Sequence, residues 1–309
     1  YYLYYNYEDN KEEALNMIQF TLTHDPKDDD AMAYTLDGSI KYDEGKYEES
    51  IQLYKKAIEI NPEFTDAYNG WAYSLFEMKK YDEAEKIYKK ALEIDPHNAY
   101  TFDYWAIMLD ELGKPEEAFD MFKKAIKYAP DNTEFLNEYG VSLLKNKKFP
   151  EALEMFDKAI ELDPKSSDGY FNKANLLYET QNYKESLSNY VRATELNSKN
   201  IKAFINASKI LSEQGNFKEA KEMLLKASEL NPKSLMPYFE LGKMMETQTN
   251  IPEAISMYKE SINRDSSKSD IYKSLGNLYE EEKKFKEAER LYKKAVRQNF
   301  PDSVYFDNK

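Results

Sequence analysis

The sequence predicts an all-α protein built from repeated antiparallel helix pairs. Three observations support this: a phrase that returns at a fixed interval, apolar residues at helical spacing on both sides of a short break, and small residues at fixed places in every repeat. Pro62, Pro96, Pro130 and Pro164 follow one another at intervals of 34 residues. The expected repeats are 31–64, 65–98, 99–132, 133–166, 167–200, 201–234, 235–268 and 269–302.

Two helices are expected in each repeat, as residues 65–98 illustrate. The first helix is indicated by Tyr68, Trp71, Ala72 and Leu75, and the second by Tyr81, Ala84, Ile87, Tyr88 and Ala91. Between them lies a glycine in some repeats and a polar pair in others. The repeat ends at an Asn-Pro or Asp-Pro pair, because proline cannot continue a helix and disfavours helical backbone in the residue before it.

Small and large residues occupy complementary places. The eighth place is always small: Gly38, Ala72, Ala106, Gly140, Ala174, Ser208, Gly242 and Gly276. The twenty-fourth place is large: Tyr54, Tyr88, Phe122, Phe156, Tyr190, Leu224, Tyr258 and Tyr292. Close approach of two helices leaves no room for a large side chain at the contact, so this alternation predicts tightly packed pairs that share their apolar faces with the next pair.

This pattern resembles the tetratricopeptide repeat, whose period is about 34 residues. The resemblance covers about nine-tenths of the chain. It implies a right-handed α-solenoid, a superhelix of antiparallel helix pairs, whose first helices line a concave groove. It also implies that the protein is a non-enzymatic scaffold that binds another protein.

Both ends of the chain are expected to be open. Residues 1–30 are interpreted as a partial repeat and linker, and residues 303–309 as the start of a further helix or a truncated end. Because the chain begins with Tyr1 and not Met, we expect that it is a piece of a longer protein, so a targeting segment could have preceded it.

Composition excludes several functions. The formal net charge is −14, from 43 Lys and Arg against 57 Asp and Glu, which disfavours binding of nucleic acid or an anionic membrane surface. Cysteine is absent and His24 and His97 are the only histidines, so thiol chemistry, Ser–His–Asp relays and multi-histidine metal sites are not expected. No phosphate-binding loop or catalytic motif is found, so we expect no cofactor and no enzymatic activity. No apolar run approaches the ~18–20 residues of a membrane span, and a cytoplasmic location is expected.

The candidate binding residues follow from the resemblance, which places the second, fifth, ninth, twelfth and thirteenth positions of each repeat on the inward face of the first helix. The selected residues are Tyr42, Asp43, Asp66, Asn69, Tyr73, Phe76, Glu77, Tyr100, Asp103, Asp110, Glu111, Asn137, Lys145, Phe171, Asn175 and Tyr178. Aromatic residues that the core does not need are favoured as binding anchors. The carboxylates predict a guest segment that is basic and partly apolar, captured faster because of its charge.

Two alternatives stay open. The chain could be the regulatory or substrate-recruiting arm of a larger enzyme, or a module that self-associates through its open ends or through the tyrosine-rich start (Tyr1, Tyr2, Tyr4, Tyr5 and Tyr7). A carboxylate clamp of the kind used by chaperone-binding relatives is disfavoured, because no three successive repeats carry more than two of its five residues.

Overall fold

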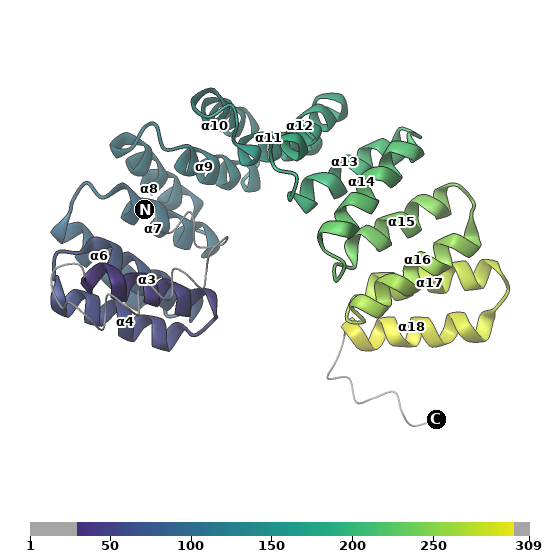
Figure 1. Cartoon of the computed structure of the whole chain (residues 1–309), viewed down its shortest axis with the longest axis horizontal. Coiled ribbons are helices and arrows are strands. Elements are labelled where there is room, and N and C mark those ends of the chain that lie inside the picture. Colours follow the sequence, from purple (N-terminus) through teal and green to yellow (C-terminus); the bar gives the residue numbers. More distant parts are fainter. Residues whose placement is uncertain (1–29, 300–309) are drawn as a thin grey trace. The chain divides into compact units, whose positions relative to one another are not determined.

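The computed structural model describes residues 30–299, and all regular structure in that range is α-helical (Figure 1). The partial repeat expected at 1–30, with its tyrosines, and the segment 303–309 lie outside the described residues, apart from Asp30 at the start of the first helix. Residues 30–299 form two compact units, which meet in sequence between Leu162 and Asp163.

The first unit contains the helices α3 (Asp30–Asp43), α4 (Tyr47–Ile60), α5 (Thr65–Glu77), α6 (Tyr81–Ile94), α7 (Ala99–Glu111), α8 (Pro115–Tyr128), α9 (Thr133–Lys145) and α10 (Phe149–Leu162). The second contains α11 (Ser167–Glu179), α12 (Tyr183–Leu196), α13 (Ile201–Glu213), α14 (Phe217–Leu230), α15 (Met236–Thr247), α16 (Ile251–Arg264), α17 (Ser269–Glu281) and α18 (Phe285–Asn299). Within each unit consecutive helices pack in pairs, which confirms the prediction of an all-α protein of helix pairs.

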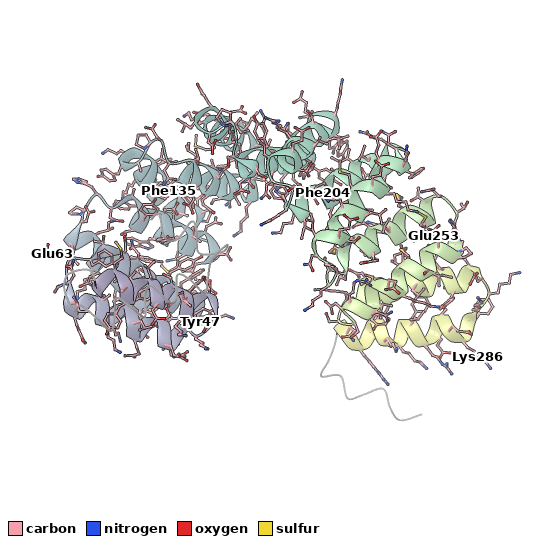
Figure 2. All side chains as sticks on the ribbon, in the orientation of Figure 1. Tyr47, Glu63, Phe135, Phe204, Glu253 and Lys286 are labelled. Carbon is pink, nitrogen blue, oxygen red and sulfur yellow. The ribbon has the colours of Figure 1, made fainter. Side chains whose placement is uncertain are left out.

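The break between repeats is a turn that the sequence builds locally. The side-chain Oδ1 of Asn61 accepts a hydrogen bond from the backbone N–H of Glu63 at 3.0 Å, and Oδ1 of Asp95 accepts one from His97 at 3.0 Å. These bonds satisfy backbone donors that the interrupted helix leaves free. Glu63 projects outward at the first of these turns (Figure 2).

Small residues at the eighth place make room for the large ring at the twenty-fourth place. A Cβ atom added to Gly242 would lie 2.6 Å from the Tyr258 ring, and one added to Gly38 would lie 2.8 Å from Tyr54. Tyr258 and Tyr54 are buried as a result. The alternation read from the sequence is therefore a direct contact between the two helices of one repeat.

The turn inside each repeat uses left-handed backbone at the same place. Gly45, Gly113 and Gly215 have φ values of 70–79°, and the equivalent residues Lys79, Lys147, Gln181, Thr249 and Lys283 have φ values of 57–62°. Glycine adopts this conformation freely, whereas a side chain is strained in it, and a β-branched side chain most of all.

We therefore predict that Thr249→Gly stabilises the protein. Relief of left-handed strain, about 1–2 kcal/mol, outweighs the backbone entropy that glycine loses, about 0.5–1 kcal/mol. The expected gain in the free energy of unfolding is about 0.5–1 kcal/mol, measured by urea titration. Gly215→Thr, the reverse change at the equivalent turn, should lower stability by a similar amount. A loss of stability in Thr249→Gly would contradict the strain argument.

Candidate functional site

The first helices of the first unit carry a continuous row of aromatic rings. Ring centroids are 5.4 Å apart between Tyr42 in α3 and Tyr73 in α5, and 5.4 Å apart between Tyr73 and Tyr104 in α7. Tyr104 lies 6.4 Å from Tyr100, which contacts the buried Phe135 of α9 edge-on at 4.9 Å. We call Tyr42, Tyr73, Tyr104 and Tyr100 the tyrosine row. All four are half-buried, so each ring keeps part of its surface available to a ligand.

Carboxylates surround the tyrosine row. The Tyr42 hydroxyl donates a hydrogen bond to Glu77 Oε1 at 3.2 Å. Burial and then the negative charge of Glu77 raise the pKa of Tyr73. A hydrogen bond with Tyr42 opposes this rise, and the charges of Glu138 and Asp103 add smaller upward contributions. Negative charge therefore converges on the rings from α5, α7 and α9.

Asp103 is the most deeply placed of these carboxylates, at 3% exposed. Burial and then the charges of Glu138 and Glu134 raise its pKa well above the ordinary 3.8. Its Oδ1 atom has no hydrogen-bond partner within the described structure. Buried polar atoms are normally bonded, so an unpartnered one in a native protein requires an explanation.

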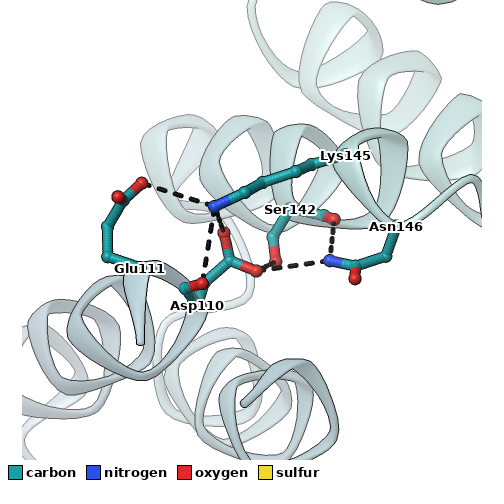
Figure 3. Close-up of polar contacts among 5 residues, drawn as sticks. All are labelled: Asp110, Glu111, Ser142, Lys145 and Asn146. Carbon is teal, nitrogen blue, oxygen red and sulfur yellow. Dashed lines mark hydrogen bonds and ion pairs between the residues drawn. The ribbon is translucent and has the colours of Figure 1, made fainter. Parts of the chain in front are cut away.

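Asp110, Glu111 and Lys145 form a separate polar cluster at the carboxyl ends of α7 and α9 (Figure 3). Lys145 Nζ lies 3.0 Å from Asp110 Oδ2 and 3.4 Å from Glu111 Oε1. Ser142 Oγ and Asn146 Nδ2 donate hydrogen bonds to Asp110 Oδ1 at 2.8 and 3.3 Å. These residues satisfy one another and join two successive repeats.

Three of the residues expected on the binding face are buried between helices. The Asn69 side chain accepts a hydrogen bond from Thr101 Oγ1 at 2.8 Å, and Asn137 Nδ2 donates one to the backbone of Thr133 at 2.9 Å. Both amides thus contribute to packing. Asp103, the third, lacks such a bond at Oδ1. Of the others in the first unit, Asp43, Asp66, Glu77, Glu111 and Lys145 are exposed, and Tyr42, Tyr73, Phe76, Tyr100 and Asp110 are half-buried.

The second unit carries Phe171, Asn175 and Tyr178, all half-buried on α11. Asn175 Oδ1 accepts hydrogen bonds from the Tyr190 hydroxyl at 2.6 Å and from Asn206 Nδ2 at 3.4 Å. The Phe171 ring lies 5.8 Å from that of Tyr190. The amide at this position is therefore engaged by the protein itself, and the two aromatic residues remain as candidate contacts.

The residues selected from the sequence leave out Tyr104, Glu138 and Asn206, which share the sixth place of their repeats. The sixth place follows the second by four residues and precedes the ninth by three, so it belongs to the same stripe of a helix. A signal for it was therefore present in the spacing. Glu134, at the second place, was also missed.

Metal-ligating side chains do not cluster near these residues in the described part of the chain. Within residues 30–299 there is no cluster of three or more His, Cys, Asp and Glu side chains that could ligate a metal. Over the same range no helix combines the length and the apolar character that crossing a bilayer requires.

Family models for the tetratricopeptide repeat match residues 41–102, 105–167, 155–187, 201–234 and 239–304. The chain belongs to the tetratricopeptide-repeat family. Proteins of this family are generally interaction modules, and all the models that match describe the repeat. No curated protein matches this tetratricopeptide-repeat chain significantly.

Solved structures share the fold. The Pseudomonas aeruginosa pilF protein is similar at 24% identity with a TM-score of 0.56, and the alignment covers 72% of this chain and 99% of that one. Human IFIT1, solved as a dimer with m7Gppp-AAAA, is similar at 17% identity with a TM-score of 0.57, covering 82% and 68% of the respective chains. At these identities the likeness concerns the architecture of this tetratricopeptide-repeat protein and not its ligand.

Proposed function

We propose that this protein is a non-enzymatic scaffold that binds a basic, partly apolar segment of another protein along the first helices of its first unit. The tyrosine row is the observation that carries the proposal. It presents half-buried aromatic surface across neighbouring first helices, where aromatic anchors supply much of the binding energy of a protein interface.

Charge defines the kind of segment. Asp66 and Glu77 are exposed on the same helices as the row, and Glu134 is exposed on α9. Such a face attracts lysine and arginine and repels phosphate, so we favour a protein segment over RNA, although the human IFIT1 structure contains m7Gppp-AAAA. The Asp110–Lys145 pair is neutralised internally and adds little to this field.

The second unit contributes less to the proposal. Its aromatic residues Phe171 and Tyr178 are candidate contacts, but its buried carboxylate Glu240 is paired with Lys209 and Lys243 at 3.5 and 3.2 Å. Charge there is balanced, so selection for a basic guest would come from the first unit.

The test uses a library of random 12-residue peptides, panned against the protein and then measured by fluorescence anisotropy. Selected peptides should be basic and contain aromatic or large aliphatic residues. Tyr73→Ala should weaken their binding by about tenfold or more, because it removes the central ring of the row. Tyr128→Ala, an exposed tyrosine on α8 outside the row, should leave binding unchanged. Thermal unfolding of each variant confirms that it is folded.

Affinity should also fall as the salt concentration rises from 50 to 300 mM, because the screening length shortens from about 14 to about 6 Å. Selection of acidic peptides, equal binding by Tyr73→Ala, or tighter binding of single-stranded RNA than of any peptide would overturn the proposal. If the average molar mass of the protein in solution doubles as its concentration rises, and no peptide binds, self-association would be favoured instead.

A further inference from the structure

We propose that Asp103 is the anchor for one arginine side chain of the bound segment, whose guanidinium pairs with the Asp103 carboxylate beside Tyr73 and Tyr104. This inference rests on the proposed function and specifies the chemistry at one point of the tyrosine row. It is based on the Oδ1 atom of Asp103, for which the described residues supply no hydrogen-bond partner.

The Asp103 carboxylate is unusual because the other buried carboxylate among residues 30–299, that of Glu240, is paired with cations. Glu240, in the second unit, is 7% exposed and has two lysines within 3.5 Å. Asp103 is 3% exposed, its Oδ1 has no hydrogen-bond partner in the described residues, and the charged groups that act on it most strongly, Glu134 and Glu138, are also negative. A cation from outside the described chain would supply what Glu240 receives from within.

A second unpartnered atom lies in the same part of the fold. The tyrosine at the twenty-fourth place elsewhere bonds its hydroxyl to a side chain of a first helix: Tyr190 to Asn175 at 2.6 Å and Tyr258 to Glu246 at 2.6 Å. In the repeat 65–98 the corresponding ring is Tyr88, which is 0% exposed and whose hydroxyl has no partner among the described residues. In this repeat the aromatic residues Tyr73 and Phe76 occupy the places from which an amide or a carboxylate bonds the corresponding tyrosine in the other repeats.

Tyr88 packs in one apolar cluster with Tyr104 of the tyrosine row and with Trp105, two positions from Asp103 on α7. Burial raises the pKa of Tyr88, and the next contributions come from Tyr73, Tyr104 and then the Asp103 carboxylate. The place between α5, α6 and α7 thus offers two oxygen acceptors, a carboxylate and a hydroxyl, beside two aromatic rings. Tyr73 and Tyr104 are half-buried, and their rings would have to move apart to admit the guest.

This combination suits arginine better than lysine. A guanidinium carries five N–H donors in a plane, so it can bond to two oxygen atoms at once and stack on a tyrosine ring. It is also less strongly hydrated than an ammonium group, which lowers the loss of hydration on burial. We therefore expect a preference for arginine over lysine at a single position of the guest.

The test uses three synthetic peptides that differ at one residue: Ac-Gly-Leu-Arg-Phe-Gly-amide and its lysine and citrulline analogues. Citrulline has the shape of arginine without the charge. The native protein should bind the arginine peptide at least about tenfold more tightly than the citrulline peptide, and several-fold more tightly than the lysine peptide, by isothermal titration calorimetry. In Asp103→Asn the advantage of the arginine peptide over the citrulline peptide should fall to about twofold or less, the weak attraction that the exposed carboxylates of the face still exert.

Two controls separate the anchor from general electrostatics. Glu240→Gln removes a buried carboxylate that has its own lysines, and Glu116→Gln removes an exposed carboxylate of α8, outside the first-helix face. Both should keep the arginine preference. If the preference persists in Asp103→Asn, or the native protein shows none while still binding the peptides, the anchor is wrong and the proposed function stands. If the native protein binds none of the three peptides and the library yields no basic peptide, both are wrong.

Discussion

Phe156→Ala is expected to lower the free energy of unfolding by about 3–5 kcal/mol, which is typical for removal of a fully buried aromatic side chain. Phe156 is 0% exposed and lies at the twenty-fourth place of its repeat, where its ring fills the space left by Gly140 on α9. The substitution would leave a cavity between α9 and α10, since neither helix can close on an absent ring without moving from its other neighbours.

Urea denaturation followed by far-ultraviolet circular dichroism measures this loss. The matched control is Phe285→Ala, because Phe285 is 63% exposed at the start of α18 and its truncation should change stability by no more than about 0.5 kcal/mol. Equal losses in the two variants would mean that the small-and-large alternation is not the basis of helix pairing. We expect a local effect, since each repeat depends mainly on its neighbours.

Asp103→Asn is expected to raise the free energy of unfolding at neutral pH by about 1–3 kcal/mol, because a neutral amide avoids the cost of ionising a buried carboxylate, about 1.4 kcal/mol for each unit by which its pKa is raised. Asp103 faces Tyr73 on α5, Tyr88 on α6, and Glu134 and Glu138 on α9, none of which is a cation. Asparagine keeps the shape of the side chain and removes the charge. The gain in stability should therefore accompany a loss of arginine preference.

The pH dependence of this gain has a definite sign. The pKa of Asp103 is raised in the folded protein, whereas in the unfolded chain it is near 3.8. Between these two pKa values the folded state binds more protons, so the contribution of Asp103 to stability falls as pH rises through the interval. Stability of native protein and Asp103→Asn, measured from pH 3 to 8, should converge at the acid end and separate as pH rises. A variant that is less stable at pH 7 would contradict this.

The opposing effects on stability and binding distinguish Asp103 from a packing residue. Replacement of Asn69 would break a hydrogen bond between α5 and α7, and replacement of Asn137 would break one within α9. Either change should lower stability without altering the preference for arginine. A residue that destabilises the free protein and improves capture of a ligand is typical of a functional site.

Much of the fold could be predicted because its determinants repeat. The eighth and twenty-fourth places meet within one hairpin, so the Gly242–Tyr258 contact follows from spacing alone. The tyrosine row was predicted in part. Tyr42, Tyr73 and Tyr100 lie at places that the resemblance assigns to the binding face, whereas Tyr104 lies at the sixth place, which was not included. Burial of Asn69 was not predictable, because its partner Thr101 lies 32 residues away on the first helix of the next repeat.

The sequence by itself determined the helix pairs, their period and the acidic character of the first-helix face, because each depends on local backbone preference, spacing along one helix, or composition. Only the tertiary structure decided which charged groups are compensated. Asp110 and Asp103 lie on the same helix, yet the first is bonded to Lys145 and Ser142 while Oδ1 of the second has no partner in the described residues. That difference arises because side chains from neighbouring repeats determine which carboxylate is reached by a cation and which is enclosed by rings.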